Sequence, residues 1–427
     1  MLFRSEVFSG WGQTKGFYRF IENKRVTMDA LSEPVYLDAA ARCGVYPKIY
    51  VPMDTTTIVL PITAIREPFG PTGKKKDSKG FFLHSAMAIT AAGLPIGLLD
   101  QQIWMRDVAT FGKKHARKER PIEEKESLKW LHSVRETKRR LDQVLGSRAP
   151  EVVFIGDRES DIHELYELFD SLKAQKVGGI IRGSWNRRIA EEPSHLRDYV
   201  ESQPVVTHRT ITVPRAPGKP KREAVLSIRY ASMVTLSPDP KKHRHRQPIG
   251  VAVVSAIEEN PPADEKDPID WLIVTTEAVS GMEDAVRIIE LYKQRWRIED
   301  FHFILKSGCN IEKYQFEDPD RYFKVTLLLS FVAMELLRLT HLGRIHPDDP
   351  ADTILSETQL KVLRTKLRIR AGPNPMTIGE AIRYIGRLGG HLGRKHDGPP
   401  GVKTLWRGWR ALQTLVDFTI AMNEMPN

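Results

Sequence analysis

Alternating and periodic hydrophobic positions predict the first elements of the chain. Residues 48–60 (KIYVPMDTTTIVL) are rich in β-branched residues and predict a strand. Residues 80–90 and 94–105 predict two more strands, joined through the hairpin turn AAG. Residues 122–146 have a helical period, with glutamates at the start and glycine at the end. This pattern predicts an amphipathic helix.

The next segment, residues 151–169 (EVVFIGDRESDIHELYELF), predicts a short apolar strand followed by a helix. Asp157 stands at the junction between them. A carboxylate at the carboxyl end of a buried strand is where α/β folds place chemistry. The alternative is that Asp157 only caps the following helix. Residues 176–184 predict one further strand.

In the second half of the chain the predicted secondary structure changes twice, first from strands to a long helix and then to mostly helical sequence. β-type runs separated by proline-rich basic loops come first, then a long helix from about residue 282, and mostly helical sequence from residue 317. We therefore predict an α/β protein with five segments: a short N-terminal helical region (1–47), the first part of the core (48–184), a β insertion (185–275), the second part of the core with its long helix (276–312), and a helical C-terminal region (313–427).

The long helix is predicted to carry one polar stripe. At about 100° per residue, four polar residues fall within an arc of roughly 60°: Tyr292, Arg295, Glu299 and Lys306. Apolar residues take the opposite side, where we expect a core: Ile298, Phe301, Ile304 and Leu305. The alternative is a solvated helix face on which Arg295 merely pairs with Glu299.

Charge and composition narrow the classes of function. The net charge of +11 favours a polyanionic partner, of which nucleic acid is the commonest. The basic residues concentrate in four runs that read as loops: 70–80, 112–120, 214–223 and 239–247. Each run alone is an ordinary solvated loop, whereas several on one body could bind many phosphates.

The chain has no feature that predicts secretion or a membrane location. Its longest apolar stretch, residues 325–337, is too short for a membrane span and contains Glu335. The N-terminus lacks the apolar segment of a signal peptide. Two cysteines, Cys43 and Cys309, give no disulfide framework and no cysteine zinc site, which fits a reducing cytoplasm.

Three carboxylates are candidates for one metal centre. If the strands that carry Asp54 and Asp157 are neighbours, the two side chains come together, and a helix on the sheet could add Glu299. Carboxylates without a histidine or thiolate cluster suit Mg²⁺ or Mn²⁺. A two-metal site of this kind serves phosphoryl transfer. Arg295 and Lys306 would then bind the phosphate.

These residues and several further segments resemble those of DDE transposases of the insertion-sequence-four family. The family signature Y-x2-R-x3-E-x6-K is matched in full by the four residues of the polar stripe. Other segments match in the same order along nearly the whole chain: GFYRFIENKRV (16–26), MDTTT around Asp54, IWMRD (103–107), EEKES (123–127), GDRESDI around Asp157 and LGGHLGRKHDGPPGVKTLWRGW (388–409).

The resemblance implies a fold and a reaction. The fold would be an RNase H-like core with a β insertion and a helical C-terminal region that forms a homodimer, with 317–342 and 403–423 as candidate helices. Asp54, Asp157 and Glu299 would bind two Mg²⁺ or Mn²⁺ ions. Double-stranded DNA, at transposon ends and target, would be nicked, closed into a hairpin, reopened and joined. No membrane partner is implied.

It also implies roles for other side chains. The tyrosine, arginine and lysine of the signature would hold the 5′ phosphate of the non-transferred strand. Trp271 would stack on a flipped base, and the alternative is a strand core residue. His302 would lie near the DNA, and the alternative is a packing residue. Arg182, after an apolar strand, is a candidate backbone contact. Four residues are interpreted as structural: His163, His84, Cys43 and Cys309.

The chain differs from the resembled family in its short N-terminal region, and this difference leaves other functions open. Only 53 residues precede Asp54, whereas the family usually has a longer N-terminal arm that recognises the transposon end. The leading hypothesis is a cytoplasmic cut-and-paste transposase. The second is a shortened, inactive regulator that pairs with the full-length enzyme. The third is a general RNase H-like nuclease without end preference, for which Trp271 and the signature cations would have no role.

Overall fold

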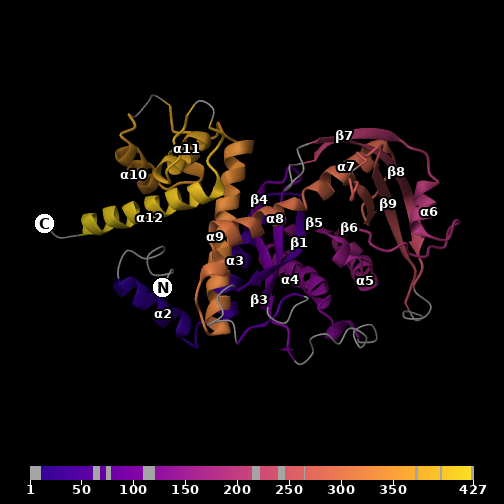
Figure 1. Cartoon of the computed structure of the whole chain (residues 1–427), viewed down its shortest axis with the longest axis horizontal. Helices are drawn as coiled ribbons and strands as arrows, with labels where there is room; N and C mark the ends of the chain where they lie inside the picture. Colours follow the sequence, from indigo (N-terminus) through magenta and orange to yellow (C-terminus); the bar gives the residue numbers. More distant parts are fainter. Residues whose placement is uncertain are drawn as a thin grey trace.

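The computed structural model describes most of the chain (Figure 1). The described residues are 11–60, 68–73, 78–108, 121–213, 222–238, 246–263, 265–370, 374–394 and 397–424. The fold is a mixed α/β arrangement with one large sheet and a helical C-terminal region. Of the four predicted basic loops, 112–120 lies outside the described residues, as do 74–77, 214–221 and 239–245 of the other three.

Ten described strands form a single mixed sheet in the order β2-β3-β1-β5-β6-β10-β9-β8-β7, with β4 paired to β3. Neighbours β1, β5 and β6 are parallel, and the other pairs are antiparallel. The bounds are β1 Lys48–Val59, β2 Gly70–Pro71, β3 Lys79–Ile89, β4 Pro95–Trp104, β5 Glu151–Gly156, β6 Val177–Arg182, β7 Thr207–Val213, β8 Arg222–Leu236, β9 Ile249–Glu258 and β10 Asp270–Thr275.

The strands of residues 185–275 continue the core sheet. β10 pairs antiparallel with β6, and β9, β8 and β7 follow outward from it. One short helix, α6 (Leu196–Glu201), precedes them. In Figure 1 these strands form the lobe on the right, next to α7. Because β10 pairs directly with β6, the lobe is attached to the sheet edge through backbone hydrogen bonds.

Helices cover both faces of the sheet because side chains alternate along each strand. On β5, Val153 and Ile155 face the hydrophobic cluster that contains residues of α7 and α8. Val152 and Phe154 face the other cluster, which contains residues of α4 and α5. The bounds of these helices are α4 Leu128–Leu145, α5 His163–Leu172, α7 Met282–Lys293 and α8 Trp296–Phe303.

The remaining helices lie at the chain ends and pack on one another (Figure 1). The N-terminal helices are α2 Trp11–Glu22 and α3 Met28–Cys43. The C-terminal helices are α9 Pro319–Ile345, α10 Glu357–Leu367, α11 Ile378–Leu388 and α12 Val402–Glu424. The last three share a cluster of their own with the end of α9. Single turns complete the described elements: Ile122–Glu124, Gly146–Arg148, Arg158–Ser160, Lys173–Gln175, Ile304–Gly308, Ile311–Lys313 and Ala351–Thr353.

Two predicted helices differ from the structure in extent. The amphipathic helix predicted from residue 122 begins at Leu128, because Lys125 is extended and separates it from a single 3-10 turn. It ends as predicted at Gly146, whose φ of 55° lies in the region that favours glycine.

The apolar stretch at 325–337 lies inside α9, which has 27 residues. By length and composition alone α9 could cross a membrane, but 67% of its most apolar window is buried. The helix therefore packs within the protein.

Candidate active site

Asp54 and Asp157 lie near each other on neighbouring parallel strands: Asp54 is within β1, and Asp157 directly follows β5. Parallel pairing of β1 with β5 sets Pro52 opposite Ile155, and each aspartate lies two residues further along its strand. This is the neighbour relation on which the predicted metal centre depends. Both carboxylates also serve the local backbone: Asp54 accepts from the Thr55 N–H at 2.7 Å, and Asp157 accepts from the Glu159 N–H at 2.9 Å. Asp157 thus caps the 3-10 turn Arg158–Ser160, and not the following helix α5 as the alternative interpretation expected.

The environment of these aspartates opposes negative charge. Burial, followed by the charge of Asp157, raises the pKa of Asp54 to about 7, and the charge of Glu299 adds to the rise. The Thr55 N–H and the Arg295 guanidinium act in the opposite direction. Burial also raises the pKa of Asp157. Carboxylates crowded with like charge are suited to a site where a bound cation replaces the missing positive charge.

Glu299 is held by Arg295. The Arg295 Nη2 donates to Glu299 Oε1 at 2.5 Å, and 52% of the Glu299 side chain is exposed. In the part of the chain that the structure describes, no three acidic, histidine or cysteine side chains are grouped closely enough to hold a metal. The predicted carboxylate trio is therefore partly assembled: the charge of Glu299 helps to raise the pKa of Asp54, while Glu299 itself forms an ion pair with Arg295.

The predicted polar stripe is interrupted in two places. Gln294 and Arg295 form a turn between α7 and α8, and Lys306 belongs to a π-helical turn. The four residues therefore do not form one continuous solvated face. Tyr292 is only 4% exposed, and Lys306 lies 3.6 Å from Glu312. The opposite, apolar side of this helical segment is buried as predicted: Ile298, Phe301, Ile304 and Leu305.

Trp271 on β10 packs against the junction of α7 and α8. Its ring packs edge-on against Tyr292, with centroids 5.5 Å apart, and against Trp296 at 6.3 Å. Trp271 is 5% exposed, so in this structure it is a buried core residue of the strand, which was the alternative to base stacking. Base stacking by Trp271 stays a prediction, and it requires the indole to become accessible.

His302 faces Asp54 from the next turn of α8. Its Nδ1 lies 3.9 Å from Asp54 Oδ2. Burial, followed by the charge of Lys306, lowers its pKa to about 3, so the imidazole is neutral at physiological pH. At 6% exposure it packs within the protein, and its predicted contact with DNA stays a prediction.

Arg182 ends β6, beside β10. Its Nη2 donates to the Asp270 carbonyl at 3.2 Å. Burial lowers its pKa, although the neighbouring Tyr292 opposes this. Its Nε has no hydrogen-bond partner among the described residues. A buried arginine with unused donors is suited to a phosphate ligand.

The residues interpreted as structural are all buried: His163, His84, Cys43 and Cys309. His84 also has a partner next to the site, because its Nδ1 lies 2.9 Å from the Thr55 hydroxyl. Burial raises the pKa of both thiols to about 12, so neither is a thiolate at neutral pH.

One residue near the site was missed by sequence reasoning. Asp161, whose side chain is fully buried, accepts hydrogen bonds from the Ser184 and Trp185 N–H groups and pairs with Arg187 at 2.5 Å. It thereby fixes the loop after β6 to the turn that follows Asp157. The sequence GDRESDI contains it, but no spacing in the sequence predicts a partner 26 residues away.

Known transposase domains match two regions of the chain. Residues 130–334 match the family model of the transposase DDE domain. This part of the chain is therefore similar to a transposase DDE domain. That region includes Asp157, Glu299 and the whole polar stripe, and begins after Asp54. Residues 331–422 match the transposase Tn5 dimerisation domain, which covers α10, α11 and most of α12.

The chain is also similar in structure to a piggyBac transposase, solved by cryo-EM as a synaptic complex with hairpin DNA. The TM-score is 0.35 at 10% sequence identity, and the match covers 90% of this chain. This chain spans about half the length of that transposase, 55%.

Proposed function

We propose that the protein is a metal-dependent DNA transposase of the insertion-sequence-four type, working as a homodimer on DNA in the cytoplasm. The observation that carries the proposal is the placement of Asp54 on β1 and of Asp157 directly after the neighbouring parallel strand β5, with Glu299 on α8 adding to the charge at Asp54. The order β4-β3-β1-β5-β6, antiparallel on one side of β1 and parallel on the other, supports an RNase H-like core.

The donor set fits divalent cations. Asp54, Asp157 and Glu299 offer hard carboxylate oxygens, and burial together with the charges of Asp157 and Glu299 raises the pKa of Asp54. These three residues would hold Mg²⁺ or Mn²⁺. Bound there, a pair of such ions would activate the attacking oxygen and stabilise the leaving oxygen. To join the site, Glu299 has to leave Arg295.

The protein's own groups then bind and orient the DNA. Arg295, once released by Glu299, has a guanidinium that is 11% exposed beside the carboxylates and free to hold a phosphate. Lys306 and Arg182 supply further positive charge on either side. Neutral His302 fills the space behind Asp54 without adding charge. This arrangement supports successive attack by water and by a 3′-hydroxyl at one centre, as hairpin formation and strand transfer require.

The test is cleavage of a duplex that carries the DNA flanking the gene, with Mg²⁺ or Mn²⁺. The wild-type protein should nick the terminal duplex, form hairpins and leave a scrambled duplex intact. Glu299→Ala should lower the rate at least about 100-fold, because it removes a ligand worth several kcal/mol to the transition state.

Glu290→Ala is the matched control, since Glu290 is 51% exposed and pairs with Lys293 on the preceding helix. Equal cleavage by Glu299→Ala and wild type would refute the mechanism. Cleavage of both duplexes would favour a general nuclease.

A further inference from the structure

The surface of α10 is strongly basic. Between residues 357 and 370 the chain has a single acidic residue, Glu357. The same stretch contains five basic residues: Lys361, Arg364, Lys366, Arg368 and Arg370. A capping box formed by Ser356 and Gln359 stabilises the start of α10. Lys361, Arg364 and Lys366 lie on this helix, and Arg368 and Arg370 follow it.

None of these five cations is neutralised by another described residue. No ion pair or side-chain hydrogen bond joins them to the described part of the chain, whereas elsewhere surface cations are commonly paired. On α4, for example, Arg139 contacts Glu33, and at the ends of two basic loops Arg222 contacts Glu258 and Arg246 contacts Glu164. The α10 surface is therefore left with a concentrated positive charge.

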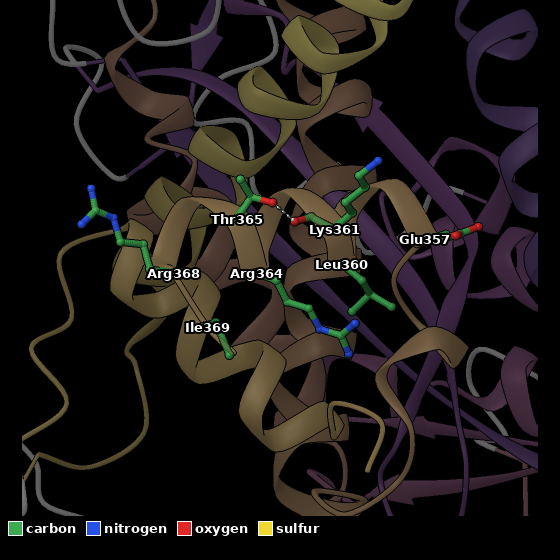
Figure 2. A pocket seen from close by; sticks show the side chains of 7 residues that line it. All are labelled: Glu357, Leu360, Lys361, Arg364, Thr365, Arg368 and Ile369. Atoms are coloured by element: carbon green, nitrogen blue, oxygen red, sulfur yellow. Dashed lines mark hydrogen bonds between the residues drawn. The ribbon is translucent and has the colours of Figure 1, made fainter. Parts of the chain in front are cut away.

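Three of the cations lie on α10 or directly after it. Lys361 and Arg364, three residues apart, share one face of α10, and Arg368 follows directly after the helix in a left-handed conformation. They surround a shallow hollow of about 520 Å³ that also includes Leu360 and Ile369. Figure 2 shows the three charged ends pointing away from one another. Divergent charges suit an extended polyanion better than a single small anion.

We propose that this face of α10 binds the backbone of double-stranded DNA, independently of its sequence. The inference rests on the proposed function, because that function brings DNA to the protein. Duplex DNA presents about one charge per 1.7 Å of its axis, so the separated cations around this hollow can each meet a phosphate. The arginines and the lysine would donate to phosphate oxygens, and the flanking apolar side chains would pack beside the sugars.

A second copy of the chain is a poor occupant for the same face. A two-fold interface sets a patch against itself, which here would oppose cation to cation. The same matched dimerisation domain offers a better surface on α12, where Phe418, Ile420 and Met422 are exposed. The α10 face therefore remains available to DNA when the chain dimerises.

The α10 contact would be separate from the cutting centre. In Figure 1, α10 lies in the lobe beyond α9, away from α8 and β1. DNA bound there would add affinity and orient a second stretch of duplex, and it would take no part in the chemistry.

The test is binding of the full chain to a 60-base-pair duplex of unrelated sequence, in EDTA, across a series of salt concentrations. The variant is Lys361→Ala/Arg364→Ala. The control is Arg135→Ala/Lys173→Ala, which removes two exposed cations without described partners from the catalytic domain. Loss of two phosphate contacts should make the slope of log K against log salt shallower by about 2 and weaken binding on the order of 10- to 100-fold at 100 mM salt.

The control should bind like wild type, and nicking of the terminal duplex at saturating DNA should be unchanged in the α10 variant. Equal affinity and slope for the α10 variant and wild type would overturn the inference. So would a shift in the monomer–dimer equilibrium with DNA binding unchanged, which would assign the face to a second copy. Wild-type nicking distinguishes these results from failure of the proposed function.

Discussion

Arg295 and Glu299 form an ion pair, 2.5 Å between nitrogen and oxygen, at the centre of the polar stripe. The same glutamate contributes to the raised pKa of Asp54. In the structure Glu299 pairs with Arg295, and the metal site that we propose would require it to join the two aspartates instead. In the same place the Arg295 guanidinium offsets part of the negative charge, because it also lowers the pKa of Asp54.

The first prediction follows from this competition. Arg295→Ala should bind Mn²⁺ several-fold more tightly than wild type when DNA is absent, because Glu299 no longer has to leave a guanidinium. The same variant should cleave DNA poorly, since the phosphate loses its partner. Calorimetric titration with Mn²⁺ measures the first effect. Lys293→Ala, which frees Glu290 in the same way, should leave the affinity unchanged, and weaker Mn²⁺ binding by Arg295→Ala would contradict the competition.

The second prediction concerns stability and pH. The pKa of Asp54 rises from 3.8 to about 7 on folding, so between these values the folded protein holds a proton that the unfolded chain has released. The contribution of Asp54 to stability is therefore present below pH 4 and is lost as the pH rises to about 7. Asp54→Asn should match wild type at pH 4. At pH 8, in EDTA, it should be more stable by on the order of 2–4 kcal/mol.

Urea denaturation at the two pH values measures this difference. Asp284→Asn is the control, and its expected change in stability has the opposite sign, because the Ser280 N–H and Arg287 lower the pKa of Asp284. That variant should lose stability at pH 8. A stability gain for Asp54→Asn that did not depend on pH would show that the raised pKa is not its cause.

The third prediction concerns the loop after β6. Asp161→Ala should cost about 3–5 kcal/mol, because it leaves Arg187 buried without its partner and frees two backbone N–H groups. Asp170→Ala, at an exposed position on α5, the helix that follows Asp161, should change stability by less than about 0.5 kcal/mol. Thermal unfolding of both variants, compared with wild type, provides the measurement; similar values for the two would remove the anchoring role of Asp161.

The fourth prediction separates the two readings of Trp271. Its burial against Tyr292 and Trp296 predicts that Trp271→Ala costs about 3–5 kcal/mol of stability. Trp185→Ala, at a tryptophan that is 67% exposed, should cost little. Denaturant unfolding tests this. If Trp271→Ala is as stable as wild type and yet forms no hairpin, the indole serves DNA and not the core.

Local pattern predicted much of the core correctly. The strands at β1, β3 and β4, the turn between the last two, and the glycine that ends α4 follow from side-chain alternation and turn chemistry. The sheet partner of β10 did not follow, because strand pairing between distant segments is not encoded in a local period. A single long helix was expected where Gln294 and Arg295 form a turn, and the 3.6-residue period continues across such a short interruption.

The elements that carry the candidate site residues were predictable from the sequence, whereas the surroundings of their side chains were not. The sequence placed Asp54, Asp157 and Glu299 on the right kinds of element. It could not give the burial that raises the pKa of Asp54, the packing that encloses Trp271, or the distant pairing of Asp161 with Arg187. Each of these depends on the three-dimensional surroundings of a side chain.

The most direct test of the central claim is Mn²⁺ binding to the DNA-bound protein, followed by electron paramagnetic resonance. Wild type and Glu290→Gln should bind Mn²⁺ alike, whereas Asp54→Asn, Asp157→Asn and Glu299→Gln should each lose affinity at least about tenfold, because each removes a charged ligand. Unchanged Mn²⁺ binding in all three variants would contradict the claim that these carboxylates form one metal site.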